Sequence, residues 1–175
     1  MTLVQFSECN PDFEVRYCKD CKKIVKLDEF EENSRCPFCS KSYFDCEPIW
    51  SINFLINEEK YQSDNKLLRA EARGAVLDPV IGLTIKDFLY IAEKIQTVDW
   101  FELLKYYFVN FSFLITRDSY VRIKKINLTE GGNLTFRQWI TTRTEDVNVD
   151  QETITSTILE RYLNEDDDDE NEPFN

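Results

Sequence analysis

Four cysteines form the pattern in this sequence that is best suited to chemistry. Cys18 and Cys21 are separated by two residues, as are Cys36 and Cys39, and fourteen residues lie between the two pairs. Each C-x2-C pair folds as a tight turn that points two thiolates at one centre, so two such turns supply the tetrahedral shell that zinc prefers. A shell of four cysteines leaves no open position for water or substrate. The sequence therefore predicts one structural zinc ion in a zinc ribbon that spans about 15–46.

The other two cysteines, Cys9 and Cys46, lie outside these pairs, and we expect them to be small buried hydrophobic residues. A redox dithiol is the alternative use of a C-x2-C pair, but it is typical of a single motif that opens a helix. The segment Met1–Asn10 lacks the basic and apolar regions of a signal peptide. We therefore interpret the cysteines in a reducing compartment, where metal binding is favoured over disulfides.

The composition excludes several classes of catalytic site. The chain has 175 residues, enough for one well-cored domain, and contains no histidine. Catalysis by Ser-His-Asp or Cys-His arrangements and zinc held by histidine are therefore excluded. We find no pairing of a nucleophile with a base and no phosphate-binding loop, so we do not expect an enzyme. The sequence also has no run of the roughly 18 to 20 apolar residues that a membrane span needs.

The acidic residues are unevenly distributed along the chain. The net charge is -12, but Glu165–Glu172 alone holds seven of the 33 acidic residues, which leaves 26 against 21 basic ones. Such a run repels itself and buries nothing, so we expect 165–175 to be a disordered tail, with a partner-binding tail or a nucleic-acid mimic as alternatives. The mild acidity of the remainder argues against a broad basic field that clamps DNA nonspecifically. It leaves room for a narrow basic groove.

Alternation of apolar and polar residues predicts four strands after the cysteine region. They cover about 49–56, 68–73, 107–115 and 120–128. In the second of these strands the inward residues Ala70 and Ala72 are small, so a bulky side chain must face them. In the last strand the inward phase slips by one residue near Lys124 and Lys125, which indicates a β-bulge. A turn signal at 130–133 precedes a further expected strand through Ile140.

Two helical segments are expected between the second and the third of these strands. Thr84 is a suitable N-cap for a helix through about Gln96. Asp99 can cap a further short helical turn that begins at Trp100.

The last helix, Gln151–Leu163, is the most clearly specified element. Asp150 is its expected N-cap, and Val149 can pack on Ile154 as a hydrophobic staple. Four residues at helical spacing form its narrow apolar stripe: Ile154, Ile158, Leu159 and Tyr162. The stripe is expected either to dock on its own domain or to pack on helices of other subunits.

With a leading strand before Val15, the expected order is strand, zinc ribbon, two strands, helix, two strands and a C-terminal helix. Five strands with a helix between the third and the fourth is the order of the OB-fold, a small Greek-key barrel that often binds single-stranded nucleic acid. We therefore expect an all-β fold with accessory helices: a five-stranded OB-fold barrel with the four-cysteine zinc ribbon inserted between strands one and two. The expected domain boundaries are 1–148 for the OB-fold, 149–164 for the C-terminal assembly helix and 165–175 for the tail.

In this placement of the ribbon, the sequence resembles the C-terminal DNA-binding domain of the replication protein A large subunit, from about Val15 to Leu163. The resemblance is carried by Cys18, Cys21, Ser34–Cys39, Ile49–Ile56, Val80–Gly82 and Phe108–Leu128. It implies a nuclear platform for single-stranded DNA whose zinc ion stabilises the fold. It also implies that Gln151–Leu163 assembles with helices of two smaller OB-fold subunits.

The sequence departs from the family pattern in two ways. The first cysteine turn is shorter than in the eukaryotic large subunit, and the third strand has Arg69 and Arg73 where aromatic stacking residues are expected. Together with the acidic tail, these features look most like the telomerase-associated paralogue of the large subunit, which tethers telomeric single strands and supports processive repeat addition. A meiotic or ordinary replicative large subunit comes next. A protein-interaction module that keeps the barrel and ribbon but scarcely touches DNA is the alternative function.

The outward positions of the expected barrel supply the candidate DNA contacts, because inward side chains fill its core. Arginine is suited to this role since its guanidinium can both contact a phosphate and stack on a base. The nominated residues are Asn53 from the second strand, Arg69 and Arg73 from the third, Phe108 and Asn110 from the fourth, and Arg122, Lys124 and Lys125 from the fifth.

Overall fold

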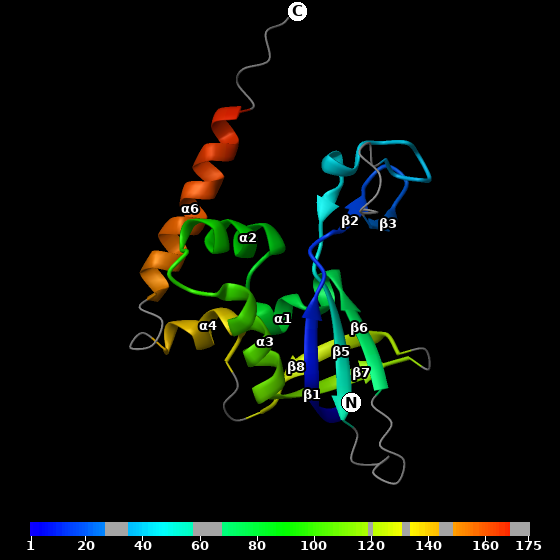
Figure 1. The fold of residues 1–175 in the computed structure, drawn as a ribbon, viewed down its shortest axis with the longest axis vertical. Coiled ribbons are helices and arrows are strands. Elements are labelled where there is room, and N and C mark those ends of the chain that lie inside the picture. Colours follow the sequence, from blue (N-terminus) through cyan, green and yellow to red (C-terminus); the bar gives the residue numbers. More distant parts are fainter. Residues whose placement is uncertain (27–34, 58–67, 119–120, 131–133, 144–148, 169–175) are drawn as a thin grey trace, which may run out of the picture.

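The computed structural model of the chain describes residues 1–26, 35–57, 68–118, 121–130, 134–143 and 149–168 (Figure 1). This part of the chain is rich in sheet, with eight strands in two antiparallel sheets and a few helices beside them. Among the described helices, none is both long and apolar enough to cross a membrane.

The larger sheet has five strands in the order β6-β5-β1-β7-β8, and all neighbouring pairs are antiparallel. Their bounds are Thr2–Pro11 (β1), Ser51–Asn57 (β5), Leu68–Arg73 (β6), Ser112–Arg117 (β7) and Ile123–Leu128 (β8). The two outermost strands also approach each other, because an isolated parallel bridge joins Glu71 of β6 to Arg122, just before β8. The N–H of Glu71 donates to the carbonyl of Val121 at 2.9 Å.

The inward face of this sheet combines stacked aromatic rings with small side chains. Phe6 of β1 stacks on Phe54 of β5 with ring centroids 4.0 Å apart. Phe54 lies opposite Ala70 in the register of β5 and β6, and both Ala70 and Ala72 are buried. Ala70 therefore has a bulky neighbour on the next strand, and the expectation that bulky side chains face both alanines stays a prediction. Aromatic pairs of this kind add about 0.5 to 1.5 kcal/mol beyond the area that they bury.

In the described part of the chain, three helices and a 3-10 turn occupy the connection between β6 and β7, and two helices follow β8. Their bounds are Gly74–Val76 (η3), Asp78–Ile81 (α1), Ile85–Lys94 (α2), Trp100–Asn110 (α3), Phe136–Thr141 (α4) and Gln151–Asp168 (α6). The helices lie together beside the sheet, and α6 runs alongside α2 (Figure 1).

The two helix starts expected before β7 are confirmed. The hydroxyl of Thr84 accepts the N–H of Asp87 at 3.1 Å, and the carboxylate of Asp99 accepts the N–H of Glu102 at 3.0 Å. Both side chains thus satisfy backbone donors that the first turn of a helix leaves unpaired.

The strand expected over 107–115 is wrong in its first half. Helix α3 continues through Asn110, and β7 begins only at Ser112. Trp100, Leu104 and Phe108 follow one another at intervals of four residues and are all buried. The run of aromatic residues in this segment fits both periodicities. The helical one prevails because it buries a whole face of α3 against β1.

The strand expected through Ile140 is also wrong, because α4 occupies this segment. The hydroxyl of Thr135 accepts the N–H of Gln138 at 3.2 Å, and the side chain of Gln138 accepts the N–H of Thr135 at 3.1 Å. This reciprocal pair is a capping box, which starts a helix. Phe136 and Ile140 lie on the buried face of the helix, so packing supports it as well.

The β-bulge expected in the last strand is confirmed. Thr116 pairs with Lys125, whereas the next residue, Arg117, pairs with Ile123. Lys124 is therefore the extra residue of β8, and both Lys124 and Lys125 are exposed.

The C-terminal helix is longer than expected. Helix α6 runs to Asp168 and so extends into the acidic run that was expected to be entirely a disordered tail. The rest of that tail, 169–175, lies outside the described residues.

The second sheet lies between β1 and β5 in the sequence, where the ribbon was expected. Its order is β3-β2-β4, with bounds Val15–Cys18 (β2), Lys23–Lys26 (β3) and Glu47–Pro48 (β4). It stands apart from the larger sheet (Figure 1). Its small core consists of Cys18, Val25, Cys36, Tyr43 and Cys46, and is separate from the core of the larger sheet. Residues 27–34 of the expected ribbon lie outside the described residues.

Candidate metal centre and nucleic-acid interface

The four cysteines of the two C-x2-C pairs meet at one point of the smaller sheet. Their sulfur atoms all lie within 4.8 Å of one another. The sulfur of Cys18 is 3.5 Å from that of Cys39, and the sulfur of Cys21 is 3.4 Å from that of Cys36. Because each close contact joins the first turn to the second, the two turns together form one site. Four thiol groups at these separations can hold a metal ion.

The two cysteine turns share a backbone feature at the residue that follows each pair. The residue after each pair, Lys22 or Ser40, has a positive φ, 57° and 61° respectively. These are left-handed conformations, which are uncommon for residues other than glycine. In the second turn the N–H of Ser40 donates to the carbonyl of Cys36 at 2.8 Å. The strain is therefore repeated at equivalent positions, as expected where two turns aim their sulfur atoms at a common centre.

Backbone N–H groups make the first cysteine of each turn the more acidic one. The N–H of Cys21 donates to the sulfur of Cys18 and is the main reason that its pKa is lowered to about 6. Burial opposes ionisation of Cys36, but hydrogen bonds from the N–H groups of Phe38 and Cys39 and from the Cys21 and Cys39 thiols together lower the pKa of that thiol. Burial raises the pKa of Cys21 to about 12. The thiolates that a metal needs are thus stabilised first at Cys18 and Cys36.

The two remaining cysteines are buried, as expected. Cys9 lies in the core of the larger sheet, where burial raises the pKa of its thiol. Cys46 lies beside the four-cysteine cluster, and burial together with the neighbouring thiols raises its pKa to about 11. Its sulfur atom lies 3.5 Å from the carbonyl oxygen of Ser42, to which the S–H donates. Cys46 therefore packs next to the site as a protonated thiol.

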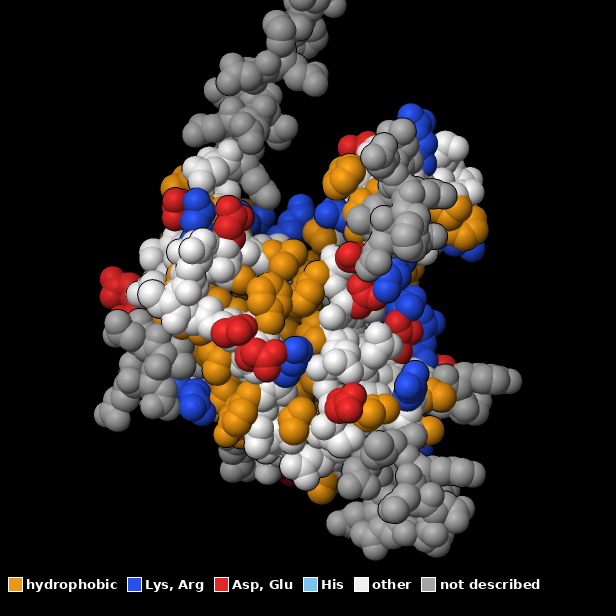
Figure 2. Space-filling view, viewed as in Figure 1, with side chains coloured by type: hydrophobic (Ala, Val, Ile, Leu, Met, Phe, Trp, Pro, Cys, Tyr) orange, Lys and Arg blue, Asp and Glu red, His pale blue; other side chains and the backbone are white. Residues whose placement is uncertain are grey.

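Strand register brings four of the residues nominated for DNA contact together on the outward face of β5 and β6 and at the residue just before β8. Asn53 lies opposite Glu71, and Glu71 is bridged to Arg122. Arg69 and Arg73 flank Glu71 at two residues on either side, so they share its face of the strand. Basic side chains, with acidic ones among them, follow the side of the molecule where β6 lies (Figure 2).

The charges of this face are not equally accessible. Arg69 and Arg122 are exposed, whereas Arg73 is half-buried. The Nε and Nη2 atoms of Arg73 each lie 2.5 Å from the same carboxylate oxygen of Glu71. The Nζ atom of Lys124 lies 3.9 Å from the Oδ2 atom of Asp118, close to the distance limit of an ion pair. Glu71 was not predicted to be part of this face, although the alternation of β6 places it between the two arginines.

Phe108 and Asn110 do not belong to this face. They were nominated from a strand that is in fact the end of α3. Phe108 is completely buried, with its ring against those of Phe6, Phe54 and Phe113. It cannot stack on a nucleobase without unfolding the core. Asn110 is exposed at the end of α3, where its side chain donates to the carbonyl of Tyr106 at 2.9 Å.

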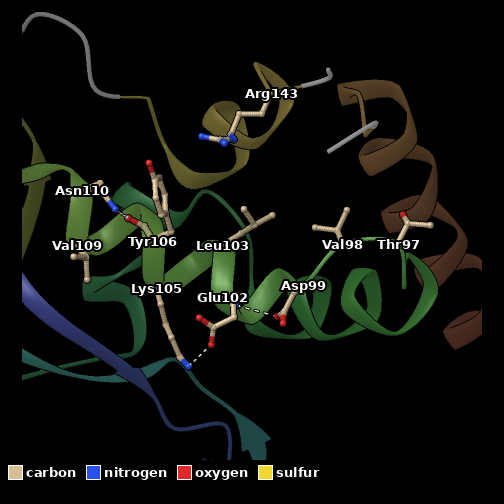
Figure 3. Close-up of a pocket in the computed structure, with 10 residues that line it drawn as sticks. All are labelled: Thr97, Val98, Asp99, Glu102, Leu103, Lys105, Tyr106, Val109, Asn110 and Arg143. Carbon is tan, nitrogen blue, oxygen red and sulfur yellow. Dashed lines mark hydrogen bonds and ion pairs between the residues drawn. The ribbon is translucent and has the colours of Figure 1, made fainter. Parts of the chain in front are cut away.

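Asn110 instead lines a groove of about 550 Å³ that was not anticipated from the sequence. The groove lies between α3 and Arg143, the second residue after the end of α4 (Figure 3). The guanidinium of Arg143 lies 5.6 Å from the ring centroid of Tyr106. Leu103 of α3 and Val98, in the connection between α2 and α3, also line the groove (Figure 3). No local sequence pattern signals this groove, because its walls come from segments more than 30 residues apart.

The apolar stripe of α6 is divided between two faces. Ile154 is completely buried and Ile158 packs against the main core, so these two residues dock the helix on its own domain. Leu159 and Tyr162 are 57% and 46% exposed, and the adjacent Leu163 is 68% exposed. These three form an exposed apolar stripe, a name we keep below. Leu163 was not among the contacts predicted from the sequence.

No protein-family model matches the chain, and no curated protein matches it at a significant level.

Proposed function

We propose that the chain is a single-stranded-DNA-binding and assembly domain similar to the C-terminal domain of the replication protein A large subunit. The observation that carries the proposal is the bridge between Glu71 and Arg122, which joins the outer strands of a sheet whose first two strands are separated by a four-cysteine ribbon. The strand arrangement, the ribbon and the basic face are all features expected of such a domain.

The fold underlying this proposal is an OB-fold barrel in which β1, β5, β6, β7 and β8 are strands one to five. Three observations support it. Strand β1 pairs with both β5 and β7, α3 lies in the connection before β7, and the bridge between Glu71 and Arg122 brings β6 to β8. A five-stranded, partly open Greek-key barrel is closed by contacts of this kind.

The metal in this proposal is one zinc ion held by Cys18, Cys21, Cys36 and Cys39. Four thiolates suit either zinc or an iron–sulfur cluster. Two C-x2-C turns on a small sheet of short strands are typical of structural zinc sites, which supports zinc. Such a shell is complete without water, so the ion stabilises the ribbon and supplies no catalytic position. We accordingly propose a binding protein and not an enzyme.

The DNA-binding face in this proposal consists of Asn53, Arg69, Arg122, Lys124 and Lys125, with Arg73 held by Glu71. All five side chains are exposed. Four of them are cations, which is the charge that a single strand's phosphates require, and the arginines can also stack on bases. The sheet supplies the rigid support.

The partners in this proposal are two smaller OB-fold subunits, bound through α6. Ile154 and Ile158 fix the helix to its own domain, which leaves the exposed apolar stripe free to pack on helices of other chains. A subunit of this kind acts in the nucleus. The telomerase-associated paralogue is the preferred specific function, in which the domain tethers telomeric single strands to telomerase and supports processive repeat synthesis. The replicative and meiotic large subunits are the alternatives.

The test is fluorescence-anisotropy titration of the zinc-loaded chain with a guanine-rich telomeric repeat and a scrambled single strand, at two salt concentrations. Tighter binding of the repeat supports the telomeric function, and equal binding of both supports a replicative one. The double variant Arg122→Ala with Lys125→Ala removes two cations that are proposed to neutralise phosphates. The slope of log affinity against log salt is negative, and this variant should make it less steep by about 0.7 for each phosphate that is no longer neutralised. The matched control Lys94→Ala, on α2, should leave the slope unchanged.

A protein-interaction module is the second candidate function. The groove between α3 and Arg143 favours it, because a hollow of about 550 Å³ lined partly by apolar side chains can receive an anchoring side chain of a partner protein. The pairing of Arg73 with Glu71 favours it too, since that pair reduces the positive charge of the sheet face. Absence of binding to either oligonucleotide in the same titration selects this function over DNA binding.

A further inference from the structure

Glu71 is an acidic residue at the centre of an otherwise basic face. Its register partner on β5 is Asn53, and its bridge partner is Arg122. An acid at this position weakens any contact with phosphates, because like charges repel. Its position is nevertheless well fixed, since its N–H donates to Val121 while its strand pairs with β5 on the other side.

The carboxylate of Glu71 is held by one oxygen only. Arg73 places both Nε and Nη2 at 2.5 Å from Oε1. Among the described residues no hydrogen bond or ion pair reaches Oε2, and the Glu71 side chain is 27% exposed. A carboxylate oxygen has two acceptor sites, so Oε2 keeps both of them for a ligand. Arg73 thus orients the acceptor without occupying it.

A second polar group on this corner of the sheet also lacks a partner. Ser51 lies opposite Arg73 in the register and is 2% exposed. Its hydroxyl oxygen is buried and has no hydrogen-bond partner among the described residues. Buried polar atoms are nearly always paired, so an unpaired one beside the Glu71–Arg73 pair indicates a place that a ligand or water completes.

The chemistry of an acceptor with two open sites distinguishes among the bases of a single strand. Single-stranded bases are read on their Watson–Crick edges. Guanine has two adjacent donors there, N1–H and the N2 amino group. Adenine and cytosine have an amino donor next to a ring-nitrogen acceptor, and thymine has one N–H between two carbonyls. Only guanine can therefore fill both sites of Oε2 without bringing a second acceptor against the carboxylate.

We propose that Glu71, oriented by Arg73, is the residue that selects guanine on the sheet face. This inference rests on the proposed function, because it assumes that a single strand lies across β5 and β6. Within that function it assigns the surrounding cations to the phosphates and the carboxylate to a base. A purely structural Glu71 that only neutralises Arg73 would confer no such preference.

The test compares two strands of mixed sequence with isolated guanines, identical except that inosine replaces every guanine in one of them. Inosine keeps N1–H and lacks only the N2 amino group. The zinc-loaded full chain should bind the guanine strand about tenfold more tightly, since one good base contact is worth about that factor. Glu71→Gln keeps the size of the side chain and places an amide next to Arg73. It should bring the ratio of the two affinities close to one while the inosine strand still binds.

Glu8→Gln is the matched control, because Glu8 is an exposed acid of β1 in the same sheet and its change removes the same charge. It should leave the ratio at its original value. A ratio that Glu71→Gln does not change, or that is near one in the unaltered chain, overturns the selection by Glu71 while DNA binding stands. Failure of the unaltered chain to bind either strand overturns the proposed function, and the role of Glu71 with it.

Discussion

Arg161 of α6 donates to one carboxylate oxygen of Asp87, at the start of α2, from two of its nitrogen atoms. The distances to Oδ1 are 2.9 Å from Nε and 2.8 Å from Nη2, and each side chain is only 8% exposed. The guanidinium also lies 4.2 Å from the ring centroid of Tyr162. This buried ion pair therefore joins the C-terminal helix to the rest of the domain and holds one member of the exposed apolar stripe in place.

Replacing Arg161 with alanine should lower the free energy of unfolding by about 3 to 5 kcal/mol, the usual cost of leaving a buried charge without its partner. The loss arises because Asp87 remains between α2 and α6 with no cation to compensate it. Urea denaturation followed by circular dichroism measures the change.

The double variant Asp87→Leu with Arg161→Met separates the ion pair from simple packing. It replaces both charges by apolar side chains, a change that is often neutral or stabilising for buried pairs. We expect it to be markedly more stable than Arg161→Ala alone. Equal losses in the two variants would show that side-chain volume, and not the uncompensated carboxylate, determines the stability of this contact.

The two faces of α6 should respond differently to truncation. Ile154→Ala should cost about 2 to 5 kcal/mol of unfolding free energy, because it opens a cavity in a buried position. Leu159→Ala and Leu163→Ala should each change it by less than about 0.5 kcal/mol, as is usual for exposed positions. The measurement is the same denaturation experiment on each single variant.

A loss at Leu163 as large as that at Ile154 would contradict this division, since it would mean that the exposed apolar stripe packs on its own domain. If the division holds, Leu159→Asp with Leu163→Asp provides a folded chain for assembly experiments. Loss of partner binding by that variant then reports the stripe itself and not unfolding.

The parts of the site that could be predicted from sequence are those set by short-range spacing. The four cysteines were identified because two C-x2-C pairs leave little freedom in where their sulfur atoms point. The bulge at Lys124 was predicted because alternation fails within the strand itself. The caps at Thr84 and Asp99 were predicted because an N-cap acts on the residues that follow it directly.

The parts that could not be predicted depend on residues that are distant in the sequence. Asp87 and Arg161 are 74 residues apart, and no local pattern pairs them. Glu71 could be assigned to the outward face by alternation, but its ion pair with Arg73 depends on the conformations of the two side chains. Phe108 was misplaced because its aromatic segment fits a strand and a helix equally well, and burial against β1 decides between them.

The start of α6 should be sensitive to acid. The N–H of Thr153 donates to the carboxylate of Asp150 at 2.7 Å, and this bond holds the pKa of Asp150 below its usual range. Because the folded pKa lies below the unfolded value, ionised Asp150 stabilises the helix at pH values above about 3.9. That contribution is lost as the pH falls through the folded pKa. Hydrogen exchange of the α6 amides between pH 6 and pH 2 should show decreasing protection, beyond the change in intrinsic exchange rates.

Asp150→Asn is the control for this titration, because asparagine is also a good N-cap but carries no titrating group. The protection of α6 in this variant should depend less on pH than in the unaltered chain. Asp150→Ala removes the cap altogether and should reduce the protection throughout the pH range. An identical pH profile in the unaltered chain and in Asp150→Asn would assign the acid sensitivity to other groups.

Loss of the metal site should unfold the ribbon and leave the larger sheet folded. Cys36→Ser with Cys39→Ser removes one of the two cysteine turns, so we expect the metal content to fall from one ion per chain to none. Amide protection should then be lost in β2 and β3, whose small core includes the cysteines. It should persist in β1, β5 and β7, because the core of the larger sheet is separate from that of the ribbon. Elemental analysis and hydrogen exchange measure the two effects.

Cys46→Ala tests whether the four cysteines are the complete set of ligands. Cys46 lies beside them and is as buried as Cys36, at 2% exposed, but its sulfur is not among the four that lie within 4.8 Å of one another. The variant should therefore keep one metal ion per chain, and its ribbon should stay protected, with some loss of stability from the small cavity. Loss of the metal from Cys46→Ala would make Cys46 a ligand. Full metal content in the Cys36 and Cys39 double variant would instead show that the two turns do not share one ion.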